Sequence, residues 1–249
     1  MNSHWIVTTV AGLCCVAIGL TAGVGLAIAK PGKIRQWARQ FGRPDYNQQW
    51  TYQQTIKFHK RIDACVPEGS VLFIGDSFIQ GMCVTAVEPG GINYGIGGDT
   101  TEGVLARLPI YSSMTRARAV VFAMGDNDLR EGRSEAEVAA NYQKIVAQVP
   151  ETVPIFFCSL TPCLQGPQFV EINRGIESLN RSLKELCASQ PRCHLVDLGP
   201  AFSDEHGCLR REFAEDDGIH LNGQGYRLCI ERIREALLPV LATNANKGV

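Results

Sequence analysis

The stretch VLFIGDSFIQG, residues 71–81, runs four apolar residues directly into Gly75, Asp76 and Ser77. A short run that is apolar at every position is typical of a strand covered on both faces of a sheet. Two interpretations compete for the polar residues that follow. In the first interpretation, they form an ordinary turn in which Asp76 or Ser77 caps the next helix. Alternatively, they hold Ser77 as a nucleophile, which requires a base and oxyanion donors elsewhere in the chain.

Four further short apolar runs resemble this one, and segments with helical periodicity separate them. A helix is predicted to begin at Ser134, because Glu137 follows at the spacing of a capping box. Apolar stripes of helical period predict two more helices, at residues 169–186 and 226–237. Alternation of strands and helices predicts a three-layer α/β/α sandwich around a parallel sheet of about five strands. The predicted strands are Val71–Ile74, Ile92–Tyr94, Ala119–Met124, Pro154–Cys158 and His194–Leu198.

Composition is consistent with one globular domain, which we assign to residues 66–242, followed by a disordered tail at 243–249. The chain has 249 residues, of which 45% are hydrophobic and 20% charged, and this length is sufficient for a sizeable core. The formal net charge is −1. A nucleic-acid partner is not expected, because it would require a strongly basic surface.

The first 29 residues are predicted to be a membrane anchor. Residues 5–29 carry no charge, and about 20 apolar residues suffice to cross a bilayer. A soluble core helix would show a polar face, which this segment lacks. A cleaved signal peptide is the other alternative, since residues 27–29 read Ala-Ile-Ala. Against cleavage, the leading MNSH has no basic residue and the apolar run is long.

Residues 30–65 are interpreted as a juxtamembrane linker and amphipathic lead-in. Five basic residues occur at 30–43 before any acidic residue, which favours the cytoplasmic face of the membrane for the single-pass protein. A periplasmic or extracellular location is the alternative, because eight cysteines follow the anchor and an even number is compatible with disulfides.

Cysteine spacing gives no unique assignment. Cys187/Cys193 and Cys158/Cys163 are candidate pairs with short loops, whereas Cys158 and two others, Cys83 and Cys229, have apolar neighbours typical of free core cysteines. The chain has no pair of C-x-x-C elements, which argues against structural zinc.

In a parallel sheet, active groups gather beyond the carboxyl ends of the strands. Polar residues follow the first three predicted strands at 75–77, 95–101 and 125–132, and a fourth polar segment, 216–226, precedes the last predicted helix. These four segments are therefore the places to search for a site.

A serine nucleophile needs an imidazole to accept its proton. His220 has Asp217 three residues before it, so one local turn could hold the carboxylate against Nδ1 while Nε2 faces Ser77. An isolated D-x-x-H pair is more often a surface pair. His206, in a loop, is a second candidate base, and Asp216 competes with Asp217 for the orienting role.

Oxyanion donors are needed as well. Gly98 offers a backbone N–H that no side chain obstructs, and Asn127 offers a side-chain amide at the end of the third predicted strand. The alternative is that both are simply turn residues.

Taken together, the four segments resemble the blocks of the GDSL/SGNH hydrolase superfamily, in its branch of lysophospholipase- and acyl-thioesterase-like enzymes. FIGDSF supplies Ser77, NYGIGGDTT supplies Gly98, MGDND supplies Asn127, and DGIHLNGQGY supplies Asp217 and His220. The resemblance covers about residues 70–240 and favours Asp217 over Asp216. The main departure is a Phe at position 78, where the family motif has Leu.

The resemblance implies a flavodoxin-like fold and a serine esterase with no cofactor or metal. Ser77, His220 and Asp217 would form the triad, and the Ser77 and Gly98 N–H groups with the Asn127 amide would form the oxyanion hole. The expected reaction is cleavage of an ester or thioester. The expected substrate is a lysophospholipid-like or small acyl ester, or a sugar O-acetyl ester in the alternative. Residues 160–169 would border the acyl pocket.

Two other classes of function remain open. Four acids at strand ends could hold Mg²⁺ for phosphoryl transfer, although this leaves the Asp217/His220 pair unexplained; otherwise they accept hydrogen bonds from loop N–H groups. A non-catalytic protein that binds a lipid or glycan is the third alternative. The sequence does not indicate an oligomeric state. The acids are Asp76, Asp99, Asp126 and Asp128.

Overall fold

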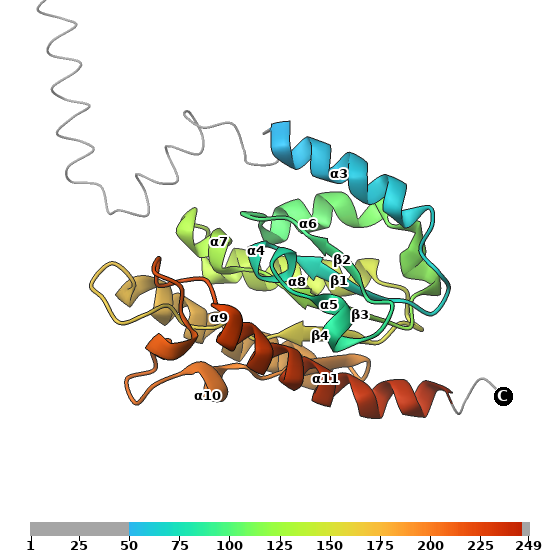
Figure 1. The fold of residues 1–249 in the computed structure, drawn as a ribbon. Coiled ribbons are helices and arrows are strands. Elements are labelled where there is room, and N and C mark those ends of the chain that lie inside the picture. The colour runs from blue at the N-terminus through green and yellow to red at the C-terminus, as the bar shows by residue number, and fades with distance from the viewer. Residues whose placement is uncertain (1–49, 246–249) are drawn as a thin grey trace, which may run out of the picture. The chain divides into compact units, whose positions relative to one another are not determined.

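Five parallel strands form a single sheet in the computed structural model, which describes residues 50–245 (Figure 1). The sheet order is β2-β1-β3-β4-β5, and every predicted strand is present with ends within two residues of the prediction. The strands are β1 (Val71–Gly75), β2 (Ile92–Gly95), β3 (Ala119–Ala123), β4 (Ile155–Cys158) and β5 (Cys193–Val196).

Helices follow or connect the strands. The longer ones are α3 (Trp50–Asp63), α6 (Thr101–Arg107), α8 (Glu135–Gln148), α9 (Val170–Ser189) and α11 (Gly223–Ala245). Short ones are α4 (Ser77–Gln80), α5 (Val84–Val87), α7 (Asp126–Arg130) and α10 (Gly199–Phe202), together with the 3₁₀ turns η2 (Leu108–Ile110), η3 (Ser112–Arg116) and η4 (Arg211–Phe213).

Alternation along β1 divides the core into two layers, because successive side chains of a strand point to opposite faces. Leu72 and Ile74 pack with residues of α6, α8 and α9, whereas Val71 and Phe73 pack with residues of α5, α10 and α11. Figure 1 shows α11 crossing one side of the sheet. Both faces of the sheet are therefore covered, as the uninterrupted apolar strands predicted.

The predicted helices at 134–149, 169–186 and 226–237 are α8, α9 and α11. Ser134 and Glu137 form the predicted capping box, in which each side chain accepts a hydrogen bond from the other residue's N–H group. On α11, the predicted stripe turns toward the sheet, and Ile233 and Leu237 are fully buried.

The stretch interpreted as a linker and lead-in contains α3, which packs on the domain. Tyr52 donates a hydrogen bond to the Gly103 carbonyl at 3.3 Å, and His59 Nδ1 lies 2.9 Å from the Tyr111 hydroxyl. Burial, with a smaller contribution from nearby Arg107, lowers the pKa of His59 to about 3, so this imidazole stays neutral at physiological pH.

From β1 the chain passes to β2, which pairs with one edge of β1, and then returns to β3, which pairs with the other edge. The strand order therefore reverses between β1 and β3. Crevices form at such reversal points beyond the carboxyl ends of the strands, where α/β proteins bind their ligands.

Two other expectations concern membranes and disulfides. Within residues 50–245, no helix has both the length and the apolar character needed to span a bilayer. The predicted anchor at 5–29 lies outside the described residues, as does most of the predicted tail. All eight cysteines beyond residue 50 are free thiols, so neither suggested pair is bonded. Cys158 and Cys229 are buried as predicted, whereas the prediction for Cys83 is wrong, because this thiol is exposed.

Candidate active site

Ser77 is the first residue of α4 and directly follows the turn at the end of β1. Asp76 caps this helix, because its Oδ1 accepts a hydrogen bond from Phe78 N at 2.9 Å. Gly75 is required by close packing, since a Cβ there would lie 2.0 Å from the Ala123 carbonyl oxygen of β3. The capping interpretation of the sequence is thus correct for Asp76, and it leaves the Ser77 side chain available for other contacts.

His220 lies beside Ser77 although 143 residues separate them. Its Nε2 is 3.0 Å from Ser77 Oγ, and its Nδ1 is 2.5 Å from Asp217 Oδ2. The other carboxylate oxygen, Asp217 Oδ1, accepts hydrogen bonds from the N–H groups of Ile219 and His220 at 2.9 and 3.0 Å. The short D-x-x-H spacing therefore builds a local turn that fixes the carboxylate against the imidazole.

Electrostatics keep Asp217 ionised. Partial burial works to raise its pKa, but the hydrogen bonds from His220 and Ile219 outweigh it and lower the pKa to about 2. The competing residue, Asp216, is fully exposed and pairs with Arg211 at 3.1 Å. His206, the other candidate base, is also exposed, lies near Glu205 and makes no contact with Ser77.

Gly98 and Asn127 come from the loops after β2 and β3. Gly98 has φ = 76°, a left-handed conformation that favours glycine. A Cβ placed on its neighbour Gly97 would lie 3.8 Å from Ser77 Cβ, so this loop runs beside the serine. Among the described residues, no acceptor is found for the N–H groups of Ser77 and Gly98. These two donors are available to a ligand.

The Asn127 amide is held in place by one good hydrogen bond. Its Nδ2 donates to the Asp99 carbonyl at 3.0 Å, and its contact with Asp76 Oδ2 is long, at 3.5 Å. The second amide hydrogen can therefore be given to a ligand at little cost.

Arg107, a residue with no role predicted from the sequence, holds these loops together from the interior of the domain. Its buried guanidinium donates to the Gly75 carbonyl at 2.9 Å, the Tyr94 carbonyl at 2.8 Å and Asp99 Oδ2 at 2.7 Å. A fourth bond, of 2.5 Å, goes to the Tyr111 hydroxyl. The sequence carried one signal, a lone charge inside the apolar stretch VLARLPI at 104–110.

Tyr226 is a second residue near the site for which the sequence predicted only a place on the apolar stripe of a helix. Its hydroxyl lies 3.0 Å from the Phe78 carbonyl and 3.5 Å from the Ser77 carbonyl. It thereby connects α11 to the helix that begins with Ser77.

The four acids considered for Mg²⁺ have other partners. Asp99 binds Arg107 and the Thr100 N–H, Asp128 accepts two hydrogen bonds from Thr101, and Asp76 caps α4. Asp126 pairs with Arg130 at 3.3 Å instead of accepting a loop N–H. Over the described part of the chain, no three His, Cys, Asp or Glu side chains are grouped to hold a metal ion.

Asp76 is buried, and no cationic side chain within residues 50–245 pairs with it. Burial, and then the nearby Asp126 carboxylate, raise its pKa well above the ordinary value for aspartate. Its carboxyl group therefore stays protonated at pH values where surface aspartates are ionised.

Two cavities lie in this part of the molecule, and the smaller of them is lined by Ser77. The smaller measures about 50 Å³ and is lined by Ser77, His220 and apolar side chains that include Met124, Ile176 and Ile219. The larger measures about 900 Å³ and is lined mainly by α9, the segment 160–167 and the loop 203–208. Ser159, Leu160 and Ile176 line both. The segment 160–169, which was predicted to border the acyl pocket, contributes lining residues to both cavities.

Comparison with known proteins agrees with the pattern of the four blocks. A model of the GDSL-like lipase/acylhydrolase family matches residues 73–228. Human platelet-activating factor acetylhydrolase IB subunit alpha1 is 31% identical over 206 residues, which cover 78% of this chain and 87% of that protein.

Solved structures share the fold at low identity. A GDSL-like lipase from Bacteroides thetaiotaomicron aligns with a TM-score of 0.61 and 20% identity, over 76% of this chain and 98% of that one. An acetyl-xylooligosaccharide esterase from Geobacillus aligns with a TM-score of 0.57 and 19% identity, over 68% and 93% respectively.

Proposed function

Because the chain belongs to the GDSL-like lipase/acylhydrolase family and is an ester-cleaving hydrolase, we propose that Ser77, His220 and Asp217 carry out its reaction. The observation that supports this assignment best is the continuous chain of contacts from Ser77 Oγ through His220 to Asp217, at 3.0 and 2.5 Å. Neither Asp216 nor His206 has comparable contacts.

In the proposed reaction, Ser77 Oγ attacks the ester carbonyl while His220 Nε2 takes the hydroxyl proton. The imidazolium that forms is stabilised by the Asp217 carboxylate, which also fixes the ring orientation. His220 then protonates the leaving alcohol, and an acyl group remains on Ser77. Water, activated by the same imidazole, releases the acid and restores the hydroxyl.

The oxyanion of each tetrahedral intermediate would receive three hydrogen bonds, from the Ser77 and Gly98 N–H groups and from the Asn127 amide. Support comes from the absence of protein acceptors for the two N–H groups among the described residues and from the long second contact of Asn127. Donors already oriented before the reaction stabilise the developing charge without reorganisation.

We propose an ester of a short acyl group as the substrate. A cavity of about 50 Å³ beside Ser77 has room for only a few atoms, because one water needs roughly 10–15 Å³ measured in the same way. The related human protein is named an acetylhydrolase, which agrees with a short acyl group. The alcohol part would occupy the adjoining cavity of about 900 Å³.

A sugar O-acetyl ester is the second candidate. The larger cavity is lined by polar side chains such as Gln165, Glu177 and Asp197, which suit a sugar better than an alkyl chain.

The test is hydrolysis of p-nitrophenyl esters of increasing acyl length by the purified chain and by Ser77→Ala. We expect the highest kcat/KM for acetyl, with a steep decline as the acyl chain lengthens. Ser77→Ala should lose about 10⁴-fold or more in kcat. The control Ser182→Ala, on α9, should keep the wild-type rates. Near-normal turnover by Ser77→Ala would overturn the assignment, and a preference for long chains would overturn the substrate class alone.

A further inference from the structure

The outward side of α3 is a mixed apolar and basic surface, which we call the α3 face: Trp50, Lys57, Phe58, Lys60, Arg61 and Ile62. Trp50, Phe58 and Ile62 are 74%, 52% and 45% exposed. The only other exposed large hydrophobic residues that the structure describes are Val170 and Leu238. Three of five such residues on one helix of 14 residues indicate an interaction surface.

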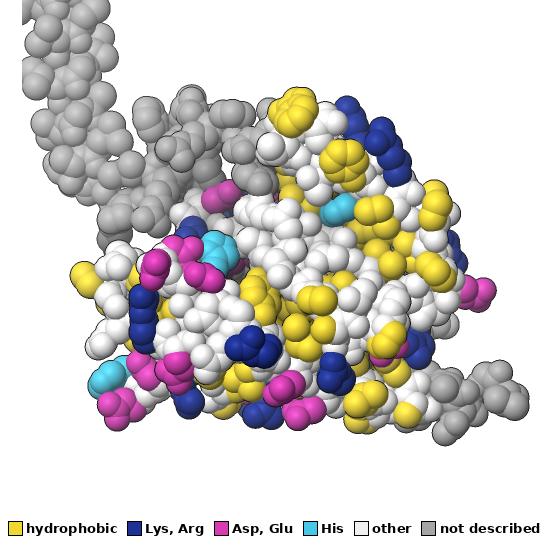
Figure 2. Space-filling view, in the orientation of Figure 1, with side chains coloured by type: hydrophobic (Ala, Val, Ile, Leu, Met, Phe, Trp, Pro, Cys, Tyr) yellow, Lys and Arg dark blue, Asp and Glu magenta, His cyan; other side chains and the backbone are white. Residues whose placement is uncertain are grey.

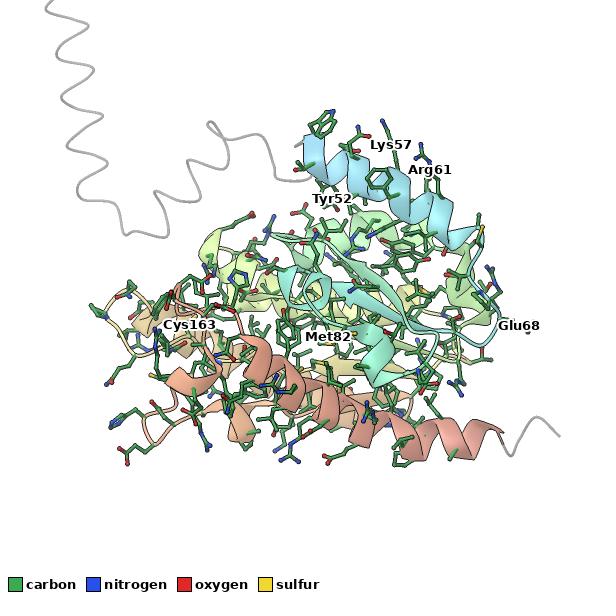
Figure 3. All side chains as sticks on the ribbon, viewed as in Figure 1. Tyr52, Lys57, Arg61, Glu68, Met82 and Cys163 are labelled. Carbon is green, nitrogen blue, oxygen red and sulfur yellow. The ribbon has the colours of Figure 1, made fainter. Side chains whose placement is uncertain are left out.

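The inward side of the helix accounts for its packing on the domain. Tyr52, His59 and Asp63 are buried, and Tyr52 points toward the sheet while Lys57 and Arg61 point away from it (Figure 3). The buried side of α3 therefore accounts for most of its packing, while Trp50, Phe58 and Ile62 keep about half or more of their surface exposed.

The charged side chains of the α3 face are all basic. Lys57, Lys60 and Arg61 are exposed and, within residues 50–245, form no ion pair with a carboxylate. The one acid of the helix, Asp63, is buried and accepts hydrogen bonds from Tyr94 at 3.0 Å and Ser112 at 2.7 Å. Figure 2 shows hydrophobic and basic side chains side by side along the edge where Figure 1 draws α3.

We propose that the α3 face docks on an anionic lipid bilayer. Basic side chains beside exposed Trp, Phe and Ile are the combination that places a helix in the plane of a membrane surface, where rings enter the headgroup region and cations meet lipid phosphates.

The sequence on the N-terminal side of α3 agrees with this partner. The uncharged run of residues 5–29 is long enough to cross a bilayer, and only residues 30–49 lie between it and Trp50. Twenty residues reach at most about 70 Å when fully extended, so α3 cannot be far from a bilayer that holds this run. Residues 30–43 add five basic residues and no acid.

The experiment places the full chain in vesicles and uses Trp50 as the reporter. Trp5→Phe and Trp37→Phe leave Trp50 as the single tryptophan. Vesicles are made of phosphatidylcholine, alone or with phosphatidylglycerol, and carry brominated acyl chains that quench a buried tryptophan. In anionic vesicles we expect a blue shift and strong quenching of Trp50 emission.

Charge reversal tests the basic residues of the α3 face. Lys57→Glu, Lys60→Glu and Arg61→Glu together should abolish the shift and the quenching in anionic vesicles. The control carries Lys144→Glu, Arg227→Glu and Arg232→Glu, which change the net charge equally at exposed positions elsewhere and should keep both. Hydrolysis of a soluble ester should be unchanged in all variants, which separates this proposal from the proposed function.

Two results would overturn the proposal. One is Trp50 emission that is unquenched in anionic vesicles, whether because the ring stays in water or because another part of the protein or a second copy covers it. The other is quenching that the triple reversal leaves intact.

Discussion

At the residue scale, the chemistry depends on groups that hold other groups in place. Arg107 donates to the Gly75 carbonyl, just before the Asp76-Ser77 turn, and to the carboxylate of Asp99, just after Gly98. The backbone carbonyl of Asp99 in turn accepts a hydrogen bond from the Asn127 amide. Burial would lower the pKa of Arg107, but Tyr111 and Asp99 raise it, so the guanidinium remains charged. One planar cation thus fixes the relative position of three loops. We regard it as a positioning residue, because it does not reach the cavity beside Ser77.

We expect Arg107→Lys to reduce kcat by roughly 10-fold to 100-fold with little change in KM. A lysine keeps the charge but cannot bind four acceptors in fixed directions. Displacing the proposed oxyanion donors would lower the rate more than it weakens substrate binding. Steady-state kinetics on a short-acyl ester will measure this effect.

Arg192→Lys is the matched control. Arg192 donates to the carbonyls of Val146, Val149 and Pro150 at 2.7, 3.0 and 2.8 Å, away from the site. We expect this variant to lose stability while keeping kcat. If Arg107→Lys likewise loses stability but keeps its kcat, the role of Arg107 is structural only.

At the element scale, the short helices after β1 and β3 are tied to their neighbours by buried polar groups. Asp128 on α7 is fully buried and accepts hydrogen bonds from Thr101 N and Thr101 Oγ1, both at 2.8 Å, at the start of α6. Asn141 of α8 donates to the same hydroxyl at 2.9 Å. These contacts connect the helix that carries Asn127 to the one that follows the Gly98 loop.

Asp128 should make stability depend on pH. Burial raises its pKa to about 6 although the bonds from Thr101 oppose this. The folded state therefore binds a proton more tightly than the unfolded chain, and the stability that this group contributes below pH 4 is lost as pH rises through 6. Compared with the ordinary aspartate pKa near 4, a pKa of about 6 corresponds to roughly 3 kcal/mol of unfolding free energy.

Urea unfolding of the wild type and Asp128→Asn at pH 4 to 7 measures this contribution. As pH rises from 4 to 6, we expect the unfolding free energy of the variant to increase relative to that of the wild type. The exposed control Asp216→Asn should show no such change. A constant difference for Asp128→Asn across this range would contradict the assignment.

At the scale of the whole molecule, the sheet order brings the site together. Ser77 follows β1 and Asn127 follows β3, the two strands between which the order reverses. The loop before α11 then returns His220 to the same edge from the opposite end of the sequence. The remaining interior consists of two apolar layers, one on each face of the sheet, without disulfides among the described cysteines, so stability rests on packing.

Thiol labelling tests this view of the interior. In a chain with Cys14→Ser and Cys15→Ser, we expect Cys65 and Cys83 to react quickly with an aromatic disulfide reagent, because both are exposed. The buried thiols should react only on unfolding; burial raises the pKa of Cys158 to about 12. Unfolding without reductant should release eight thiols in all, and a smaller number would reveal a disulfide.

Local chemistry and periodicity determined much of this protein from the sequence. Strands covered on both faces must be apolar throughout, so their positions were readable, and the Ser134 capping box and the D-x-x-H turn form within a few residues. Contacts between residues far apart in the sequence could not be predicted from such local patterns. That Asp217 rather than Asp216 meets the imidazole followed from family resemblance, and the residues alone left it open.

Only the tertiary structure decided what lies beneath and beside the site. Arg107 binds four acceptors that come from β1, β2 and the residues around α6, and no local pattern encodes such a meeting. The 50 Å³ cavity is likewise a space left between side chains of distant segments. The physical reason is that periodicity reports which face of an element is buried, whereas a cavity or a buried charge depends on which other elements close over that face.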